Sequence, residues 1–226
     1  MPMPANPLPH TETVHALSSH FRDWVMRNVE PPPSRYPTLR ENQLADAEKT
    51  ALGFPTIPGL RATAPERGFI NPVLDYDWGR RFDPNDGSGI MDNTVPLIKQ
   101  VIRMLAPKVD ADGNELGGVP VVLRDAPLGT YLGWNITADG ALPFHRGKLC
   151  TYAGGMVPFA KTRAERMAKN DPRPSLEERY RDHAGYVEAV RKAAANAVAQ
   201  KFLLPQDADA LIAAAEKSAV LKQGDK

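Results

Sequence analysis

The side chains best able to do chemistry in this sequence include one thiol and one serine set among glycines. Cys150 lies five residues after His145, so a thiol nucleophile with an imidazole base is one candidate catalytic pair. No local feature such as a helix start would lower the pKa of this thiol, which favours an ordinary small buried residue. Serine catalysis needs the pattern G-x-S-x-G, which the sequence does not contain. Ser88, in the segment DGSGI, is therefore predicted to lie in a flexible turn.

Three histidines near the start of the chain are candidates for metal binding. His10, His15 and His20 recur every five residues. Five residues of helix rotate a side chain by about 140°, so the three cannot share one face. We therefore expect solvent-facing or partly packed histidines here, and the sequence assigns no catalytic, metal-binding or cofactor-binding residue.

A short acidic segment resembles the start of a calcium-binding loop. It carries Asp110, Asp112 and Asn114 at alternate positions. Such a loop needs glycine at position six and glutamate at position twelve, whereas this sequence has Glu115 and Val121 there. A hairpin turn in which Gly113 adopts a positive φ explains the same residues better.

Two large aromatic residues and an amide lie close together in the second half of the chain. Tyr131, Trp134 and Asn135 stand beside two glycines and the polar residues 137–140. This composition suits the wall of a ligand pocket, and it equally suits a core cluster that closes a strand end. We keep both interpretations open.

A series of charged residues follows, and it is predicted to form ion pairs and caps on helix surfaces. No feature of the sequence supports a bound anion there. The residues concerned are Arg163, Arg166, Arg173 and Arg179, with Asp171, Glu177 and Glu178.

The elements that must position these residues are helical at both ends of the chain. A broad apolar stripe predicts an amphipathic helix over residues 11–29, capped by Thr11 or Thr13. Ser175 and Glu178 have the spacing of a capping box. Further helices are expected over residues 162–169, from residue 175 onward, over residues 186–202 and over residues 207–220, with a break at Leu-Pro 204–205.

Between these ends, the chain is predicted to be mostly coil with one small hairpin. Its 17 glycines and 22 prolines make up about 17% of the residues, against a usual 12% or so, and they are concentrated in residues 30–95. Long helices and central strands are unlikely in such a segment, which is expected to wrap against a surface supplied elsewhere or by the chain's own ends. Residues 97–109 and 119–123 are predicted to be the two strands around the acidic turn.

The predicted fold class is α+β, with three regions. These are an amphipathic helix (residues 1–29), a wrapping coil (30–96) and a C-terminal hairpin with helices (97–226). A net charge of +1 disfavours binding to nucleic acid or to a membrane surface. The sequence shows neither a spanning apolar run nor a signal peptide, so as written we expect it in the cytoplasm.

An ordered series of motifs spans almost the whole chain. It comprises NPLPHTETVHAL and FRDWV, PPPSRYPTL, GFPTIPG, APKVDADGNELGGV, PLGTYLGWN, VPFAKTRAERMAKNDPRPSLEERY and FLLPQDADALIAAAE. This series resembles the C-terminal part of the "alpha/beta hydrolase domain" family, whose members are similar to serine esterases.

The resemblance implies an α/β-hydrolase core with a serine, acid and histidine triad, located upstream of the region matched here. The first helix would then be the last helix of that core. No histidine of this chain stands in a motif that identifies it as the catalytic one: His10, His15, His20, His145 and His183. We therefore expect a C-terminal portion that is inactive alone, with the missing core as its partner and a small ester as the substrate of the whole.

Two alternatives remain at this stage. The chain could be an autonomous noncatalytic binding or interaction module, or a small enzyme that uses Cys150 with a histidine.

Overall fold

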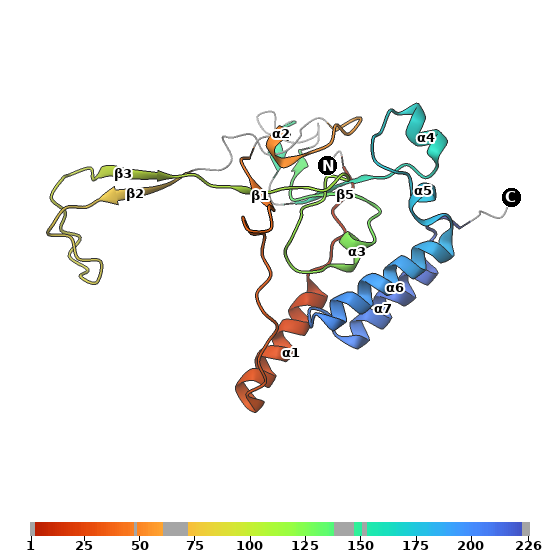
Figure 1. Ribbon diagram of the computed structural model, residues 1–226, viewed down its shortest axis with the longest axis horizontal. Coiled ribbons are helices and arrows are strands. Elements are labelled where there is room, and N and C mark those ends of the chain that lie inside the picture. Colours follow the sequence, from red (N-terminus) through yellow and green to blue (C-terminus); the bar gives the residue numbers. More distant parts are fainter. Residues whose placement is uncertain (1–2, 48, 61–71, 138–146, 151–152, 223–226) are drawn as a thin grey trace.

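The structure is a computed structural model that describes residues 3–47, 49–60, 72–137, 147–150 and 153–222. Helices dominate the C-terminal half, and the strands form antiparallel pairs (Figure 1). The predicted α+β fold class is confirmed. Within the described residues, no helix is both long and apolar enough to cross a membrane.

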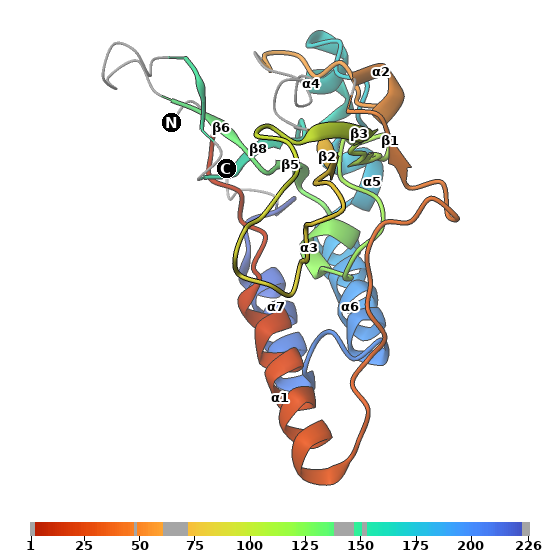
Figure 2. The same cartoon turned by 90° about the vertical axis from the view of Figure 1, so that its left-hand side faces the viewer.

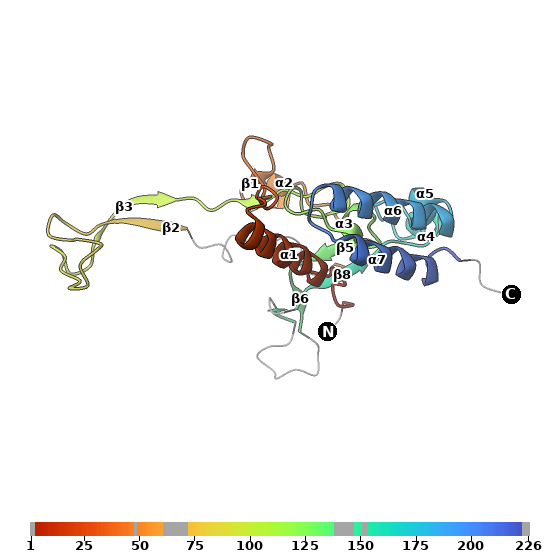
Figure 3. The same ribbon diagram turned by 90° about the horizontal axis from the view of Figure 1, so that it is seen from below.

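Two long helices form the larger hydrophobic core. Helix α6 (His183–Ala199) and helix α7 (Pro205–Lys217) lie side by side (Figures 1 and 3). The Asp182 side chain caps α6 by accepting a 2.8 Å hydrogen bond from the Gly185 amide. Pro205 occupies the first turn of α7, where its missing N–H has no partner to lose, so the predicted break at this position is confirmed.

Two short helices complete this core. Val122 of α3 (Val122–Asp125) and Tyr180 of α5 (Leu176–Tyr180) are buried against the same cluster as Val190 of α6. The predicted second strand at residues 119–123 is therefore wrong. Burial of Val122 against α6 outweighs the β propensity of the local sequence.

The predicted strand at residues 97–109 is divided between two different pairs. Strand β3 (Leu97–Ile102) pairs with β2 (Val73–Asp77), and β4 (Ala106–Pro107) pairs with β1 (Leu44–Ala45). The acidic turn follows β4 and is closed by an isolated bridge between Val109 and Glu115. Gly113 has a φ of +82°, as the turn prediction requires.

The central sheet pairs β5 (Gly129–Leu132) with β8 (Gly155–Pro158). A shorter pair joins β6 (Asn135–Ile136) to β7 (Leu149–Cys150). The N-terminal segment runs along β8, because the Met156 amide donates a 3.0 Å hydrogen bond to Pro4 O. A second apolar cluster joins β5 to α2 (Lys49–Leu52) and β4, including Leu52, Phe54 and Leu132.

Helix α1 (Thr11–Arg27) confirms the amphipathic helix predicted for the start of the chain. Its N-cap is His10, which makes no capping hydrogen bond through its side chain, so the predicted cap by Thr11 or Thr13 is wrong. Ala16 is its only buried residue. The apolar stripe of α1 is exposed to solvent and consists of Val14, Leu17, Phe21, Trp24, Val25 and Met26. Figure 2 shows α1 extending beside α7 to one end of the molecule.

The described part of residues 30–95 is mostly coil, as predicted, but β1, α2 and β2 interrupt it. The ribbon of β2 and β3 extends away from the rest of the molecule as an arm (Figure 1). At its tip, Trp78 stacks on Phe82 with ring centroids 5.1 Å apart, and Arg81 pairs with Asp92. The strands of the arm pair with each other, and every residue of β3 is exposed on both faces of the ribbon.

Candidate functional site

An apolar pocket lies between β5 and the segments that carry α2 and β4. Its volume is about 180 Å³, and most of its exposed lining is apolar. The lining comprises Leu52, Phe54, Ala106, Pro107, Val109, Gly113, Glu115, Tyr131, Leu132, Gly133 and Trp134.

Backbone pairing holds together the two segments that form one wall of the pocket. The Val109 amide donates a 3.0 Å hydrogen bond to Leu52 O, which fixes the end of α2 beside the strand that precedes the acidic turn. The opposite wall is β5, whose residues are all buried. The pocket therefore brings together residues as distant in the sequence as Leu52 and Tyr131, which are 79 residues apart.

Two of the three residues considered as a pocket wall line this pocket. They are Tyr131 and Trp134. The Tyr131 hydroxyl accepts a 3.0 Å hydrogen bond from the Leu128 amide, and burial raises the pKa of Tyr131 to about 12. A neutral phenol that is already hydrogen-bonded contributes an apolar ring to the pocket.

Asn135 is absent from the lining and has a structural role. It is fully buried, and its Nδ2 donates a 3.1 Å hydrogen bond to Met3 O. Its Oδ1 accepts a hydrogen bond from the Ile136 amide. Asn135 thus fastens the N-terminal segment beside the sheet.

A buried arginine, Arg173, holds β5 from the side opposite the pocket. Its burial was not predicted from the sequence. Arg173 was expected on a helix surface, but its side chain is 1% exposed and pairs with Asp171, which is also buried. Its Nε and Nη2 donate to the Asp171 carboxylate at 2.9 and 2.6 Å. Its Nη1 donates to Thr130 Oγ1 at 2.8 Å and to Val157 O at 3.0 Å. The ion pair therefore joins the loop before α5 to both strands of the central sheet.

The remaining Nη2 donor of Arg173 reaches the carbonyl oxygen of Pro158 at 3.4 Å. All five N–H groups of the guanidinium then have acceptors within the protein. Arg173 has no donor left for a ligand, which argues against an anion site at this residue. Burial raises the pKa of Asp171, but hydrogen bonds from Arg173 outweigh burial and leave that pKa below its ordinary value.

The acidic turn also contacts β5, the strand that Arg173 holds. Asn114 accepts a 2.8 Å hydrogen bond from the Tyr131 amide and donates from Nδ2 to Gly129 O, so its side chain pairs with β5 as a neighbouring strand would. Asp112 pairs with Arg179, whose guanidinium lies 4.2 Å from the centre of the Phe159 ring. These residues therefore stabilise β5, in place of the calcium site that their spacing resembles.

Other charged residues of this region lie at the surface and cap helices, as predicted. Ser175 and Glu178 form the expected capping box, and Thr162 caps α4 (Arg163–Ala168). Arg166 donates to both carboxylate oxygens of Glu178, at 2.8 and 3.1 Å. Hydrogen bonds from the Ser175 backbone, from Arg166 and from the Ser175 hydroxyl lower the pKa of Glu178 to about 2.

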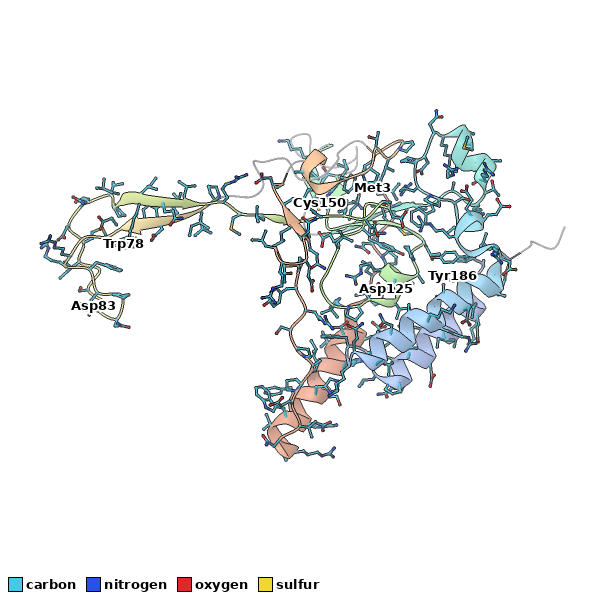
Figure 4. The ribbon with its side chains drawn as sticks, in the orientation of Figure 1. Met3, Trp78, Asp83, Asp125, Cys150 and Tyr186 are labelled. Carbon is cyan, nitrogen blue, oxygen red and sulfur yellow. The ribbon has the colours of Figure 1, made fainter. Side chains whose placement is uncertain are left out.

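Neither candidate nucleophile hydrogen-bonds to a histidine within the described residues. Ser88 lies in an exposed turn and donates from Oγ to Asp86 Oδ2 at 2.6 Å. Cys150 is a half-buried free thiol in β7, in the central part of the molecule (Figure 4). Its suggested partner, His145, lies outside the described residues.

The histidines near the N-terminus do not come together. His15 Nδ1 lies 3.3 Å from Asp207 Oδ2, which pairs α1 with α7. The part of the chain that the structure describes contains no group of three or more His, Cys, Asp or Glu residues suited to a metal ion.

Comparison with known families gives a match over most of the chain. The sequence profile described as "Alpha/beta hydrolase domain" matches residues 1–213 of the 226. The chain therefore belongs to the alpha/beta hydrolase domain family, as its series of motifs indicated. Comparison with curated proteins found no match, and comparison with solved structures found none either.

Replacing Arg173 should show how strongly the network depends on it. Arg173→Met leaves the Asp171 carboxylate buried and unpaired, which is expected to lower the free energy of unfolding by about 3–5 kcal/mol. Arg191→Met is the matched control, because that arginine is half exposed and pairs with Glu216 at the surface. In the control variant, the free energy of unfolding should fall by less than about 1 kcal/mol. If chemical denaturation shows the same decrease in the free energy of unfolding for both variants, the role assigned to Arg173 is contradicted.

The capping box should make stability depend on acid. The pKa of Glu178 is about 2 in the folded chain and 4.5 as its ordinary value, so its contribution is present above pH 4.5 and is lost as pH falls toward 2. Glu178→Gln should lower Tm at pH 6 and converge with the unmodified chain near pH 2. The exposed Glu188→Gln serves as the control and should leave the pH profile unchanged. A constant Tm difference across this range would contradict the prediction.

Proposed function

We propose that this chain supplies the C-terminal part of an ester-hydrolysing serine enzyme and is inactive alone. Family membership supports the hydrolase class. The observation that carries the rest of the proposal is the exposed apolar stripe of α1, because an exposed apolar helix face is expected to pack against another surface.

The chemistry of ester hydrolysis supports the proposal that the chain is inactive alone. A serine esterase needs a nucleophile, a base and oxyanion donors assembled at one place. The sequence lacks G-x-S-x-G, and no serine hydroxyl within the described residues hydrogen-bonds to a histidine. Both ring nitrogens of His183 face backbone carbonyls, those of Val220 and Glu216. That histidine is therefore held by the C-terminal helix and is unsuited to act as a general base.

The stripe on α1 supports a missing partner. Its large members include Phe21 at 62% exposure, Trp24 at 49% and Met26 at 75%. An amphipathic helix gains stability by burying its apolar face against another element, and a contiguous exposed patch usually marks an interaction surface. We assign that surface to the core of the hydrolase. In this arrangement residues 1–29 complete the core, residues 30–96 wrap over it and residues 97–226 form an outer elaboration.

An autonomous noncatalytic module is the second candidate, and the helical core favours it. Residues such as Val190, Ala194 and Leu203 are buried without any contribution from a partner. A single cooperative unfolding transition of the isolated chain would support this candidate, whereas a sloping transition would argue against it.

Hydrolysis assays on two forms of the protein test the main proposal. We expect no turnover of nitrophenyl acetate above background by these 226 residues. A form extended at its N-terminus by the preceding in-frame coding sequence should turn the ester over at least about tenfold above background, and serine-to-alanine substitution in its G-x-S-x-G motif should abolish the activity. Turnover by the short chain, or an upstream sequence without the motif, would refute the proposal.

A charge placed on the α1 stripe tests whether the stripe is covered in the extended form. Phe21→Asp should destabilise the extended form by about 2 kcal/mol or more, because it would bury an unpaired carboxylate, and should change the short chain by less than about 0.5 kcal/mol. Met167→Asp is the control, since Met167 of α4 is similarly exposed but lies in the proposed outer elaboration. If Phe21→Asp has the same small effect on both forms, α1 does not contact a hydrolase core.

A further inference from the structure

The pocket beside β5 has the size of a single small ring. Its volume is about 180 Å³. A cavity of roughly 150 Å³ lined by aliphatic and aromatic side chains is large enough to bind benzene. One aromatic ring or a branched alkyl group of similar size therefore fits inside the pocket, whereas most of a long acyl chain would extend out of it into solvent.

The lining selects for a neutral apolar group. Aliphatic and aromatic side chains supply most of it, and Glu115 is the only charged residue among the lining residues that the structure describes. Glu115 follows the acidic turn that carries Asp110 and Asp112. A carboxylate ligand would meet negative charge here and find no cation among the described lining residues to pair with.

The walls are held in place from outside the pocket. On one side the Asn114 side chain accepts a hydrogen bond from the Tyr131 amide, and on the other the Val109 amide donates to Leu52 O. These bonds oppose collapse of the space. At Gly133, an added Cβ would meet no atom within 4 Å, so a larger side chain can be introduced there without an immediate clash.

We propose that this pocket binds the neutral, ring-sized apolar group of an ester substrate, in its acyl or its alcohol part. The ester role rests on the proposed function, whereas the binding of a small neutral ring is a property of this chain. A hydrolase core that presents its nucleophile near the pocket would thus prefer esters of compact aromatic or branched groups over esters of long chains.

The three tryptophans allow a direct test by NMR of their indole N–H groups. Trp134 lines the pocket, whereas Trp24 lies on the exposed stripe of α1 and Trp78 on the arm (Figure 4). Titration with benzyl alcohol should give a saturable shift at Trp134 and only small linear shifts at the other two. Benzoate, which has a similar size and a negative charge, should bind about threefold or more weakly.

Two substitutions that fill the pocket should abolish the Trp134 shift. They are Gly133→Leu and Ala106→Leu, which act from opposite walls. Gly87→Leu is the matched control, because Gly87 also has open space around an added Cβ but lies at the tip of the arm. The control should bind benzyl alcohol as the unmodified chain does.

Several results would overturn the proposal. Equal shifts at all three indoles would mean that the alcohol adsorbs to exposed apolar surface, and tighter binding of benzoate would contradict the charge argument. A Trp134 resonance at its random-coil position would mean that the pocket does not form in solution. Unchanged binding by both filling variants would place the ligand elsewhere.

The ester role has its own readout in the N-terminally extended form. Gly133→Leu should raise KM for benzyl acetate at least about tenfold relative to ethyl acetate, because burial of the ring is lost. Binding of benzyl alcohol without any hydrolysis by the extended form would refute the proposed function and leave the pocket's ligand class intact. Hydrolysis without binding at Trp134 would refute the subsite alone.

Discussion

The buried ion pair between Arg173 and Asp171 is the interaction on which the centre of this structure depends. Moving two charges out of water is costly, and only complete hydrogen bonding compensates for it. Here the guanidinium uses every donor, on the Asp171 carboxylate, on Thr130 and on the carbonyls of Val157 and Pro158. A sheet of only two short strands is thereby fixed to the loop that precedes α5.

The contacts of Arg173 with β5 and β8 explain how a sheet of two short strands can form one wall of a pocket. Two-stranded sheets are marginal in water unless other elements pack on them or pair with them. The Asn114 side chain extends the pairing of β5 on one side, and Arg173 ties β5 and β8 to the helical region on the other. One face of β5 is thus free to line an apolar space without losing its position.

The periphery of the molecule has no comparable support. The α1 stripe and the arm of β2 and β3 expose large apolar side chains, such as Trp24 and Val101. A self-sufficient centre and uncovered outer elements together favour a protein that completes its fold against a further surface. That contrast is the reason for proposing a hydrolase core as the partner.

The features predicted correctly from the sequence depend on local signals. Gly113 in the acidic turn and the capping box of Ser175 with Glu178 are specified by residues a few positions apart. The amphipathic pattern of α1 is equally local, and the order of the motifs was enough to identify the family.

Apart from the N-cap of α1, where the local prediction of Thr11 or Thr13 was wrong, the errors concern residues whose environment comes from distant segments. Residues 119–123 have a strand-like composition, but Val122 packs on α6, which lies about 60 residues further along the chain. Arg173 sits in a polar sequence typical of a surface, and its partner Thr130 lies 43 residues away. The pocket was anticipated only through Tyr131 and Trp134, because its other wall comes from segments around α2 and β4. Neither spacing nor periodicity could bring these segments together.

Native-state hydrogen exchange of the Tyr131 amide tests the central claim most directly. This amide donates to Asn114 Oδ1 inside the network that Arg173 completes. We expect it to be among the slowest-exchanging amides of the chain, and to exchange through global unfolding. Exchange as fast as that of the amides in the exposed β2–β3 arm would contradict the account, because β5 would then be no better held than a ribbon in solvent.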